Sequence, residues 1–366
     1  MMGPRQEAQA ALFYEFSLED HVPHNHLVRS IDRFVDLTSV RVHLADFYSH
    51  TGRPSIDPEL LIRMLLIGYC FGIRSERRLC EEVHLNVAYR WFCRLDLTDR
   101  IPDHSSFFKN RNGRFRESDL LRHVFETTVA RCMKEGLVGG QGFAVDASRS
   151  NKTAEVGAMR KMLDRTEERF GVKPDWIAAD TAYGSSDTLV WLALKRQIVP
   201  FIPVFDKGER TDGIFSRSDF TWDDENDRYI CPGGKEMRHT WRTYSDPKRN
   251  APVWKSRNYR ALKSDCTGCE LKAKCCPNAE TRSVHRDKYE IVRDFARQCT
   301  TSDFNPKAQA RRKKVEMLFA HLKRILGLGR LRLRGPCGVQ DEFTLAAIAQ
   351  NLRKLAKLKP ILPAAG

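Results

Sequence analysis

The sequence lacks an apolar run long enough to cross a lipid bilayer. Its longest apolar run, Leu60–Ile73, is shorter than the ~20 residues that a membrane-spanning helix needs, and Arg63 interrupts it. Residues Met1–Phe16 are polar throughout and lack the apolar region of a secretory signal. These absences exclude a membrane-embedded function, so we expect a cytoplasmic protein with no membrane partner.

The sequence also contains no internal repeat and no low-complexity linker. Its 366 residues, 41% of them hydrophobic, are enough for two or three domains with apolar cores. The formal net charge of +15 predicts a polyanionic partner, nucleic acid before an anionic membrane. A basic surface without such a partner is the alternative, and the local clustering of charge argues against it.

Acidic residues are scarce between Lys307 and Arg334, where ten lysines and arginines accompany a single carboxylate, Glu316. Apolar residues in this stretch recur at helical spacing and form one stripe, made of Val315, Leu318, Phe319, Leu322, Ile325 and Leu326. Arg312, Glu316 and Lys323 project within an arc of roughly 40° on this helix. One interpretation of Glu316 is that it forms an i,i+4 ion pair with Arg312, which stabilises a helix by about 0.2–0.5 kcal/mol. The other is that Glu316 binds a metal ion, and that the surrounding cations bind nucleic-acid phosphates.

The central segment alternates strands with helices. Three buried strands are predicted, at residues 142–147, 176–180 and 198–204. Two helices lie between them, at residues 155–170 and 189–195. This order predicts an α/β core with parallel strands, and Pro200 and Pro203 favour an edge position for the third strand.

Asp146 and Asp180 stand at the ends of the first two predicted strands. Ligands of parallel sheets bind beyond the carboxyl ends of the strands. Two converging carboxylates need a shared proton or a cation to offset their repulsion, and Mg²⁺ prefers carboxylate oxygens together with water and phosphate. The alternative is that one or both aspartates only cap the turn that follows the strand.

Residues 17–135 are predicted to form mostly short helices. Asp57 followed by Pro58 marks the start of the helix over Leu60–Ile73. Further helices are predicted over Ser75–Val83, Asn86–Leu95 and Asp103–Arg116. The last of these carries the basic residues Lys109, Arg111 and Arg114. A helix-turn-helix DNA-binding module and an ordinary small helical bundle both fit this pattern.

Disulfides are not expected in a cytoplasmic chain, although the sequence has 11 cysteines. Five of them cluster in a polar, turn-rich stretch after the third strand: Cys231, Cys266, Cys269, Cys275 and Cys276. We predict a tetrahedral zinc site formed by Cys231, Cys266, Cys269 and Cys275, with Cys276 in reserve. Free thiols and an iron–sulfur cluster are the alternatives, and the other six cysteines are assigned to apolar cores.

Arg330, Arg332 and Arg334 alternate with leucines, so an extended segment would place all three arginines on one face. Such a face suits contact with backbone phosphates, and a solvated edge strand is the alternative. A final helix is predicted over Asp341–Leu358.

Three acidic blocks follow one another in the chain: VDAS at Val145–Ser148, AADTAYGS at Ala178–Ser185, and the R-x₃-E-x₆-K spacing of Arg312, Glu316 and Lys323. In this order they resemble the blocks of bacterial insertion-sequence transposases of the DDE type. The tyrosine that such proteins often carry three residues before the arginine is replaced by Gln309. The region around Arg53–Phe115 resembles the helical domain that precedes the catalytic core in one branch of this family, so the similarity covers nearly the whole chain.

The resemblance implies a ribonuclease H-like α/β catalytic core, with an N-terminal all-helical domain and a small zinc-ribbon-like, cysteine-rich insertion. Asp146, Asp180 and Glu316 would be the catalytic residues and would bind two Mg²⁺ or Mn²⁺ ions, while Arg312 and Lys323 would bind DNA. One ion would activate water or a 3′-hydroxyl, and the other would stabilise the leaving oxygen. Zinc in the insertion also gains support, because these transposases often carry such an insertion.

The expected domains follow from these assignments. They are a helix-turn-helix-like DNA-binding domain at residues 1–135, a catalytic core at 136–205 and 300–360, and the insertion at 206–299. Short strands are predicted within the insertion at Tyr229–Ile230 and Val253–Trp254.

Asp146 and Asp180 are only 34 positions apart (180 − 146). In ribonuclease H-like cores, two further strands and a helix separate the strands that carry the first two acids. Here only Ala147–Thr153 precedes the helix, and this segment spans at most about 25 Å, too little for a two-strand hairpin as well. We therefore predict that the second and third strands are missing, as after an internal deletion, and that the first strand has an unpaired apolar edge.

The resemblance thus implies a transposase that acts on double-stranded DNA, both the inverted-repeat ends of its element and the target, associates with itself on DNA and lies at the nucleoid. A catalytically decayed copy that only binds DNA is one alternative. A zinc-containing nucleic-acid-binding protein without recombinase ancestry is another.

Overall fold

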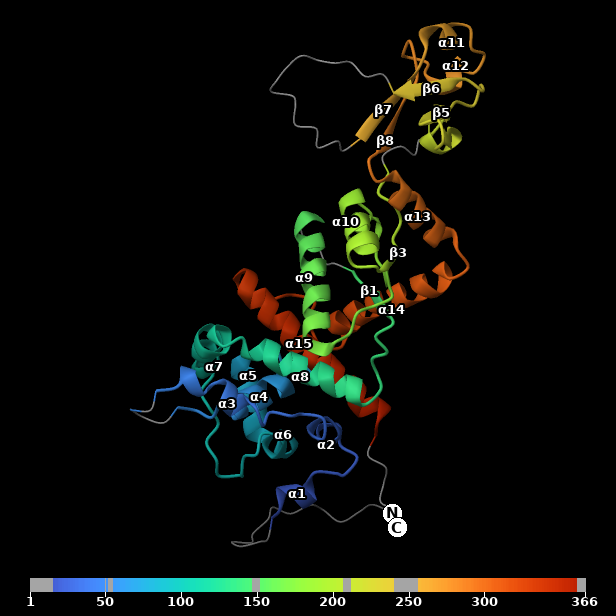
Figure 1. The fold of residues 1–366 in the computed structure, drawn as a ribbon. Helices are drawn as coiled ribbons and strands as arrows, with labels where there is room; N and C mark the ends of the chain where they lie inside the picture. The colour runs from blue at the N-terminus through green and yellow to red at the C-terminus, as the bar shows by residue number, and fades with distance from the viewer. Residues whose placement is uncertain are drawn as a thin grey trace, which may run out of the picture. The chain divides into compact units, whose positions relative to one another are not determined.

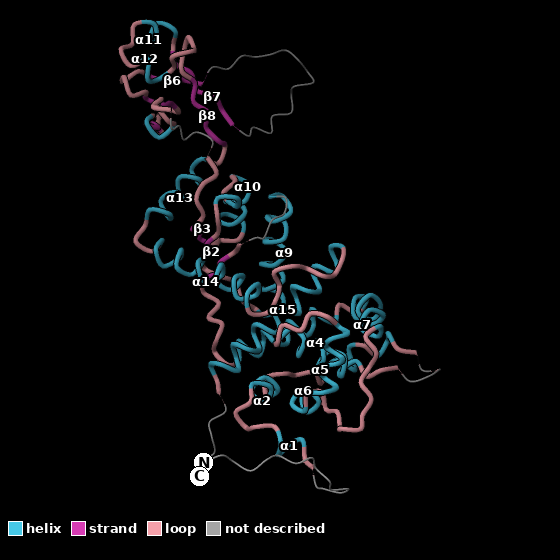
Figure 2. The backbone as a smooth tube through the Cα atoms, turned by 180° about the vertical axis from the view of Figure 1, so that it is seen from behind, coloured by secondary structure: helices cyan, strands magenta, loops and turns pink. Residues whose placement is uncertain are grey.

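The computed structural model describes residues 16–49, 51, 55–146, 152–206, 212–239 and 256–360. The chain divides into two compact units, which can be followed in Figures 1 and 2. One unit combines Met1–Gly139 with Met317–Gly366, and the other is Gly140–Glu316. This division differs from the expected domains, because the residues after Glu316 join the N-terminal helices and not the α/β core.

The first unit is helical, without a strand in its described residues. Its elements are α1 (Leu18–His21), α2 (Leu27–Asp32), α3 (Val40–His43), η1 (Ala45–Phe47), α4 (Pro58–Cys70), α5 (Glu76–Leu85), α6 (Val87–Phe92), α7 (Ser105–Asn110), η2 (Arg111–Phe115), α8 (Leu120–Lys134) and α15 (Gly335–Leu358). The end of α14 (Asn305–Arg324) also belongs to this unit.

Helix α4 forms the centre of the first unit because it is apolar on nearly all sides. Asp57 accepts the N–H of Glu59 at 3.1 Å and Pro58 occupies the first turn, so the predicted helix start is confirmed. The helix ends at Cys70, three residues before the predicted Ile73. Gly72 there adopts a left-handed φ of +73°, and the Ile73 N–H donates back to the Gly68 carbonyl, which closes the helix.

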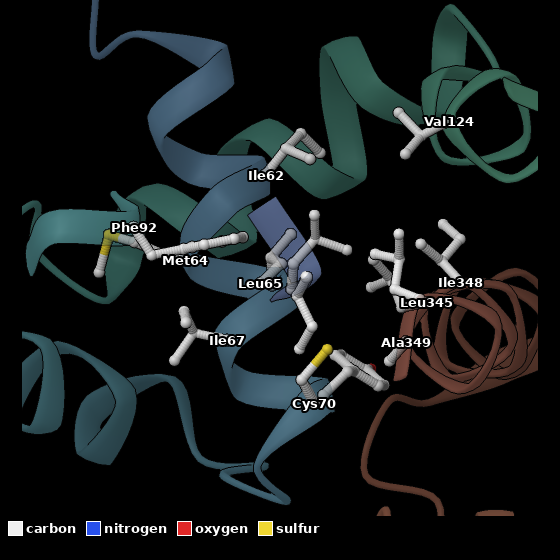
Figure 3. Close-up of a cluster of buried hydrophobic side chains, with 14 of the residues drawn as sticks. Ile62, Met64, Leu65, Ile67, Cys70, Phe92, Val124, Leu345, Ile348 and Ala349 are labelled. Atoms are coloured by element: carbon white, nitrogen blue, oxygen red, sulfur yellow. The ribbon is translucent and has the colours of Figure 1, made fainter. Parts of the chain in front are cut away.

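The C-terminal helix α15 completes this core. Figure 3 shows Leu345 and Ile348 of α15 beside Leu65 of α4, with Val124 of α8 near Ile62, and all five side chains are buried. Helix α15 packs against α2, α4 and α8, and the described core of the unit runs through all four helices. The helix begins at Gly335, six residues before the predicted start.

The second unit contains a small parallel sheet. Strands β1 (Gly142–Ala144), β2 (Trp176–Ala178) and β3 (Val199–Phe201) pair in the order β1-β2-β3. The connections contain α9 (Lys152–Phe170), η3 (Thr181–Tyr183), α10 (Ser186–Val190) and η4 (Trp191–Lys195). The predicted parallel α/β order is therefore confirmed, and β3, which contains Pro200, lies at a sheet edge as predicted.

Both faces of this sheet are covered. Alternate residues of β2 point to opposite sides. Ile177 packs with side chains of α9, α10 and α13 (Glu290–Thr301), while Trp176 packs with Phe304 and with Ala308 at the start of α14. The Trp176 ring also lies so close to Gly142 that any side chain at Gly142 would overlap it.

All three described strands of this sheet are parallel, and β1 pairs only with β2 among them. Residues 145–151 separate β1 from α9, and residues 147–151 lie outside the described part. Within the described residues, the sheet therefore lacks the two strands that we predicted to be missing, and β1 is an edge strand.

The insertion forms an antiparallel sheet in the order β4-β5-β6-β7-β8. The strands are β4 (Thr221–Asp223), β5 (Arg228–Ile230), β6 (Glu236–His239), β7 (Ser256–Ala261) and β8 (Ser283–Asp287), accompanied by η5 (Arg217–Asp219), α11 (Lys263–Thr267) and α12 (Lys272–Cys275). The strand predicted at Tyr229–Ile230 lies in β5, and the one predicted at Val253–Trp254 lies outside the described residues. Helix α13 follows the sheet and packs against β3 and α10, so it belongs to the α/β core although we had placed it in the insertion.

Candidate functional site

Asp146 and Asp180 lie side by side at the carboxyl ends of β1 and β2. The parallel register pairs Gly142 with Trp176 and Ala144 with Ala178, and each aspartate follows the last paired residue of its strand by two positions. The Val145 N–H donates to the Ala178 carbonyl at 2.9 Å, so the pairing continues beyond the strand ends. The fold thus brings together the two acids that the sequence placed at neighbouring strand ends.

Asp180 also caps the turn that follows β2. Its Oδ1 accepts the N–H of Ala182 at 2.9 Å at the start of η3. The capping role that we considered as an alternative is therefore present at Asp180. It occupies one of about four lone-pair positions of the carboxylate, so it is compatible with a cation on the other positions.

A third carboxylate, Glu155, lies near enough to act electrostatically on Tyr183, as do the two aspartates. Burial, together with the negative charges of Glu155, Asp180 and Asp146, raises the pKa of the Tyr183 hydroxyl to about 12. Tyr183 itself is buried, with 2% of the residue exposed. We had treated Glu155 only as the start of a helix. The available signal was its place in the first turn of α9, nine positions after Asp146 (155 − 146).

Glu316 lies apart from this group. Its side chain is 47% exposed and forms an ion pair with Arg312 at 3.1 Å, which is the i,i+4 alternative considered from the sequence. The helix ends at Arg324, so Ile325 and Leu326 of the predicted apolar stripe lie beyond it. The stripe is buried only in part, because Leu322 and Leu326 are buried while Ile325 is 53% exposed. Among the described residues, no three His, Cys, Asp or Glu side chains are arranged to hold a metal ion, so neither Glu316 nor Glu155 completes a metal-binding triad with the two aspartates here.

The residues at the strand ends fit a hard divalent cation through their chemistry. Asp146 and Asp180 offer only oxygen donors, which Mg²⁺ and Mn²⁺ prefer. A bound cation would also offset the electrostatic repulsion between these carboxylates.

The cysteines of the insertion gather around one small cavity of about 20 Å³, lined by Cys231, Cys266, Cys269, Cys275 and Cys276. Sulfurs of Cys231 and Cys269 both lie 3.7 Å from the position that a Cβ of Gly233 would take. The Lys235 N–H donates to Cys231 Sγ at 3.3 Å. Burial raises the pKa of the Cys275 thiol to about 11. The donor set therefore fits zinc, although the thiols of the described chain are not in a ligating arrangement.

Arg330, Arg332 and Arg334 are exposed and line a single open hollow of about 610 Å³ together with Gly327, Leu331 and Leu333. We call Arg330–Arg334 the arginine segment and this cavity the arginine hollow. Among the described residues, no acidic side chain lines the hollow. The segment is not an edge strand, the alternative considered from the sequence, because its backbone bends and forms no ladder with another described strand. All three arginines line the hollow, but Leu331 and Leu333 line it too, so a single arginine face stays a prediction.

The other predicted DNA-binding residues differ in accessibility. Lys109 and Lys323 are exposed, and Arg312 is held by Glu316. Arg114 lies over the Tyr48 ring, 4.2 Å from its centroid. Arg111 is only 5% exposed and pairs with Glu76, so the structure contradicts a phosphate-binding role for its side chain.

Two family models match the chain. One, described as "Transposase domain (DUF772)", matches residues 16–113, and the other, described as "Transposase DDE domain", matches residues 230–356. The second match includes the cysteine cluster, Glu316 and the arginine segment. Neither the curated proteins nor the solved structures contain a match to this chain. In the described residues, no helix is both long and apolar enough to span a membrane.

Proposed function

Because the chain belongs to the insertion-sequence transposases of the DDE type, we propose that it binds double-stranded DNA at the inverted-repeat ends of its element and catalyses metal-dependent strand cleavage and strand transfer. The observation that carries this proposal is the matched register of Asp146 and Asp180 at neighbouring strand ends. We further propose that β1–β3 with their helices are the remaining part of a ribonuclease H-like core.

Asp146 and Asp180 would hold the divalent ions, with Glu316 as the third acid assigned by its R-x₃-E-x₆-K position. Bound Mg²⁺ or Mn²⁺ would supply an activated water or 3′-hydroxyl and would stabilise the leaving oxygen of an in-line displacement. The chain itself contributes carboxylate oxygens at the ends of two paired strands. The cations of α14 near Glu316, Arg312 and Lys323, would hold the DNA backbone.

A catalytically decayed transposase that only binds DNA is the second candidate. It is favoured by the three-stranded sheet and by the separation of Glu316 from the aspartates. A strand-transfer assay with Mg²⁺ on DNA that carries the element's ends distinguishes the two. DNA cleavage that a chelator abolishes supports the enzyme, and chelator-insensitive binding without cleavage supports the decayed copy. Either form would act at the nucleoid and would associate with itself on DNA, where the two element ends must meet.

The arginine hollow is proposed as a contact for backbone phosphates. Substituting Arg330, Arg332 and Arg334 together by alanine is expected to weaken binding to duplex DNA on the order of tenfold. The slope of log K against log salt should fall by about 0.9 for each phosphate that the variant no longer binds. Fluorescence anisotropy at several salt concentrations measures both quantities. Arg78→Ala is the matched control, because Arg78 is exposed but already pairs with Glu82. An unchanged slope in the triple variant would remove the hollow from the DNA interface.

Zinc is proposed for the cysteine cluster. The purified chain is expected to contain about one zinc ion, and a Cys266→Ser/Cys269→Ser variant should contain none, because a structural zinc site needs four ligands. Elemental analysis measures the zinc content. Cys337→Ser serves as the control, since Cys337 is exposed and lies outside the cluster. A zinc-free native protein whose Cys266 and Cys269 react freely with an alkylating reagent would reject this site.

A further inference from the structure

The buried side of the arginine segment is held by a single carboxylate. Glu342 lies on α15 and is only 2% exposed. Its two oxygens accept the N–H of Arg332 at 3.0 and 3.1 Å, and Oε1 also accepts the N–H of Leu333 at 3.2 Å. Two successive backbone donors on one buried carboxylate fix the path of the segment where the middle arginine emerges, because charge-assisted hydrogen bonds are the stronger kind.

A second contact from the same helix supports this path. A Cβ added to Gly338 would lie 2.7 Å from the Leu333 Cβ and 3.2 Å from the Leu333 carbonyl carbon, so Leu333 rests directly on the α15 backbone. Gly338 and Glu342 are four residues apart and therefore lie on the same face of α15. The segment is thus held at two adjacent points of one rigid helix.

The carboxylate is not isolated in the core. The Arg74 guanidinium lies 2.9 Å from Glu342 Oε1, with 3% and 2% of the two side chains exposed. Arg74 also lies over the Tyr69 ring, 4.5 Å from its centroid. Neither terminal nitrogen of Arg74 has a hydrogen-bond acceptor among the described residues, so its contact with Glu342 is electrostatic.

Such a buried ion pair is costly to form, and an apolar residue at position 342 would fill the space without that cost. What an apolar residue could not do is accept the two N–H groups of the segment. Arg332 and Leu333 line both the arginine hollow and a second cavity of about 200 Å³ that Glu342 and Arg74 line on the inner side. The segment therefore separates the two cavities. Its backbone contacts with Glu342 and α15 on the inner side fix the positions of its exposed arginines on the outer side.

We propose that Glu342 is the positioning residue of the arginine hollow. Glu342 holds the Arg332 and Leu333 backbone against α15. In the free protein, this places Arg330, Arg332 and Arg334 in the positions in which they would bind one backbone phosphate of DNA. Preorganisation of this kind raises affinity because less ordering remains to be done on binding. The inference rests on the proposed DNA-binding function of the hollow.

The test measures binding of the full chain to a fluorescently labelled random-sequence duplex as a function of salt, since phosphate contacts do not depend on sequence. Glu342→Gln keeps the shape of the side chain but removes its charge. It also replaces one acceptor oxygen by an amide N–H₂ group, which cannot accept the N–H groups of Arg332 and Leu333. We expect it to weaken binding severalfold and to lower the salt slope toward that of the triple arginine variant. In the triple arginine background, Glu342→Gln should have no further effect. Asp341→Asn is the matched control, because Asp341 is the neighbouring acid of α15 and pairs instead with Arg116.

The outcomes separate the two claims. A wild-type salt slope in Glu342→Gln, with a reduced slope in the triple variant, overturns the positioning role alone. A wild-type slope in the triple variant overturns the phosphate contact and the positioning role with it. An effect of Glu342→Gln that persists in the triple background means that Glu342 acts on general stability, which also overturns the proposal.

A second variant and a second measurement cover the case in which Glu342→Gln does not fold. Gly338→Ala pushes on Leu333 from the same helix and is expected to lower the slope in the same way. In the wild-type protein, the amide protons of Arg332 and Leu333 should exchange with solvent much more slowly than that of Arg330. Equal exchange at all three positions would overturn the proposal.

Discussion

Substitution of Asp146 or Asp180 by alanine is expected to reduce Mn²⁺- or Mg²⁺-dependent cleavage of end DNA to background, at least a thousandfold below the starting protein if the metals carry most of the charge stabilisation. DNA binding should stay within about twofold, because the phosphate contacts lie elsewhere on the chain. Gel assays of cleavage and anisotropy measurements of binding test the two halves of this prediction. Calorimetric titration with Mn²⁺ adds a readout without turnover, and both variants should lose Mn²⁺ binding.

Asp180 needs a more selective variant because it also caps η3. Asparagine accepts the same N–H from Ala182, and it caps about as well as aspartate, so Asp180→Asn should keep the stability of the protein while losing cleavage. Asp180→Ala should lose cleavage and about 1 kcal/mol of the free energy of unfolding. Glu316→Gln belongs in the same series, since its family position predicts the same loss of cleavage.

Asp175→Ala provides the matched control for this series. Asp175 is exposed, immediately precedes β2, and thus lies at the opposite end of the strand from Asp180. It should cleave DNA as the unsubstituted chain does. Cleavage at the starting level by Asp146→Ala or Asp180→Asn would refute a metal role for the strand-end pair.

Transposition in cells that express this chain alone is expected at background frequency. The described core has three parallel strands, and β1 pairs with β2 only, so the wall that two further strands would build beside the acids is missing. A genetic assay that counts movement of a marked element between plasmids measures the frequency. The expected frequency lies at background because transposition requires cleavage and joining at both element ends, and DNA held less precisely slows every one of these steps. Single cleavage events at end DNA should still be measurable with purified protein.

The informative comparison is a chain in which a two-strand segment from a full-length member of the family is inserted between β1 and α9. This chain should transpose well above background and should aggregate less, since the inserted strands would cover the edge of β1. Robust transposition by the original chain would show that the three-stranded core is sufficient and would contradict the proposed deletion.

The strand-end aspartates were predictable from local pattern alone. Short buried strands that end in acids, separated by helices, dictate a parallel sheet, and equal spacing from the strand ends then places Asp146 opposite Asp180. The start of α4 was equally local, because an aspartate cap followed by proline depends on neighbouring residues only. The alternation of Arg330, Arg332 and Arg334 predicted a basic surface there, although it did not predict that the backbone bends.

Other features depended on partners distant in the sequence. In the sequence, Arg111 cannot be distinguished from the other basic residues near it. In the structure, it forms a buried ion pair with Glu76, which lies 35 positions away (111 − 76). Helix α15 was assigned to the catalytic core from its position in the chain, yet its apolar face is buried against α4 and α8.

The sequence by itself determined the α/β order, the two strand-end acids, the basic character of the C-terminal region and the family. Each of these depends on composition or on spacing within a few residues. Only the tertiary structure decided which charged groups are buried and paired, among them Arg111, Glu342 and Arg74. The physical reason is that burial of a charge is tolerated only where a partner is present, and that partner is supplied by packing between elements far apart in the chain.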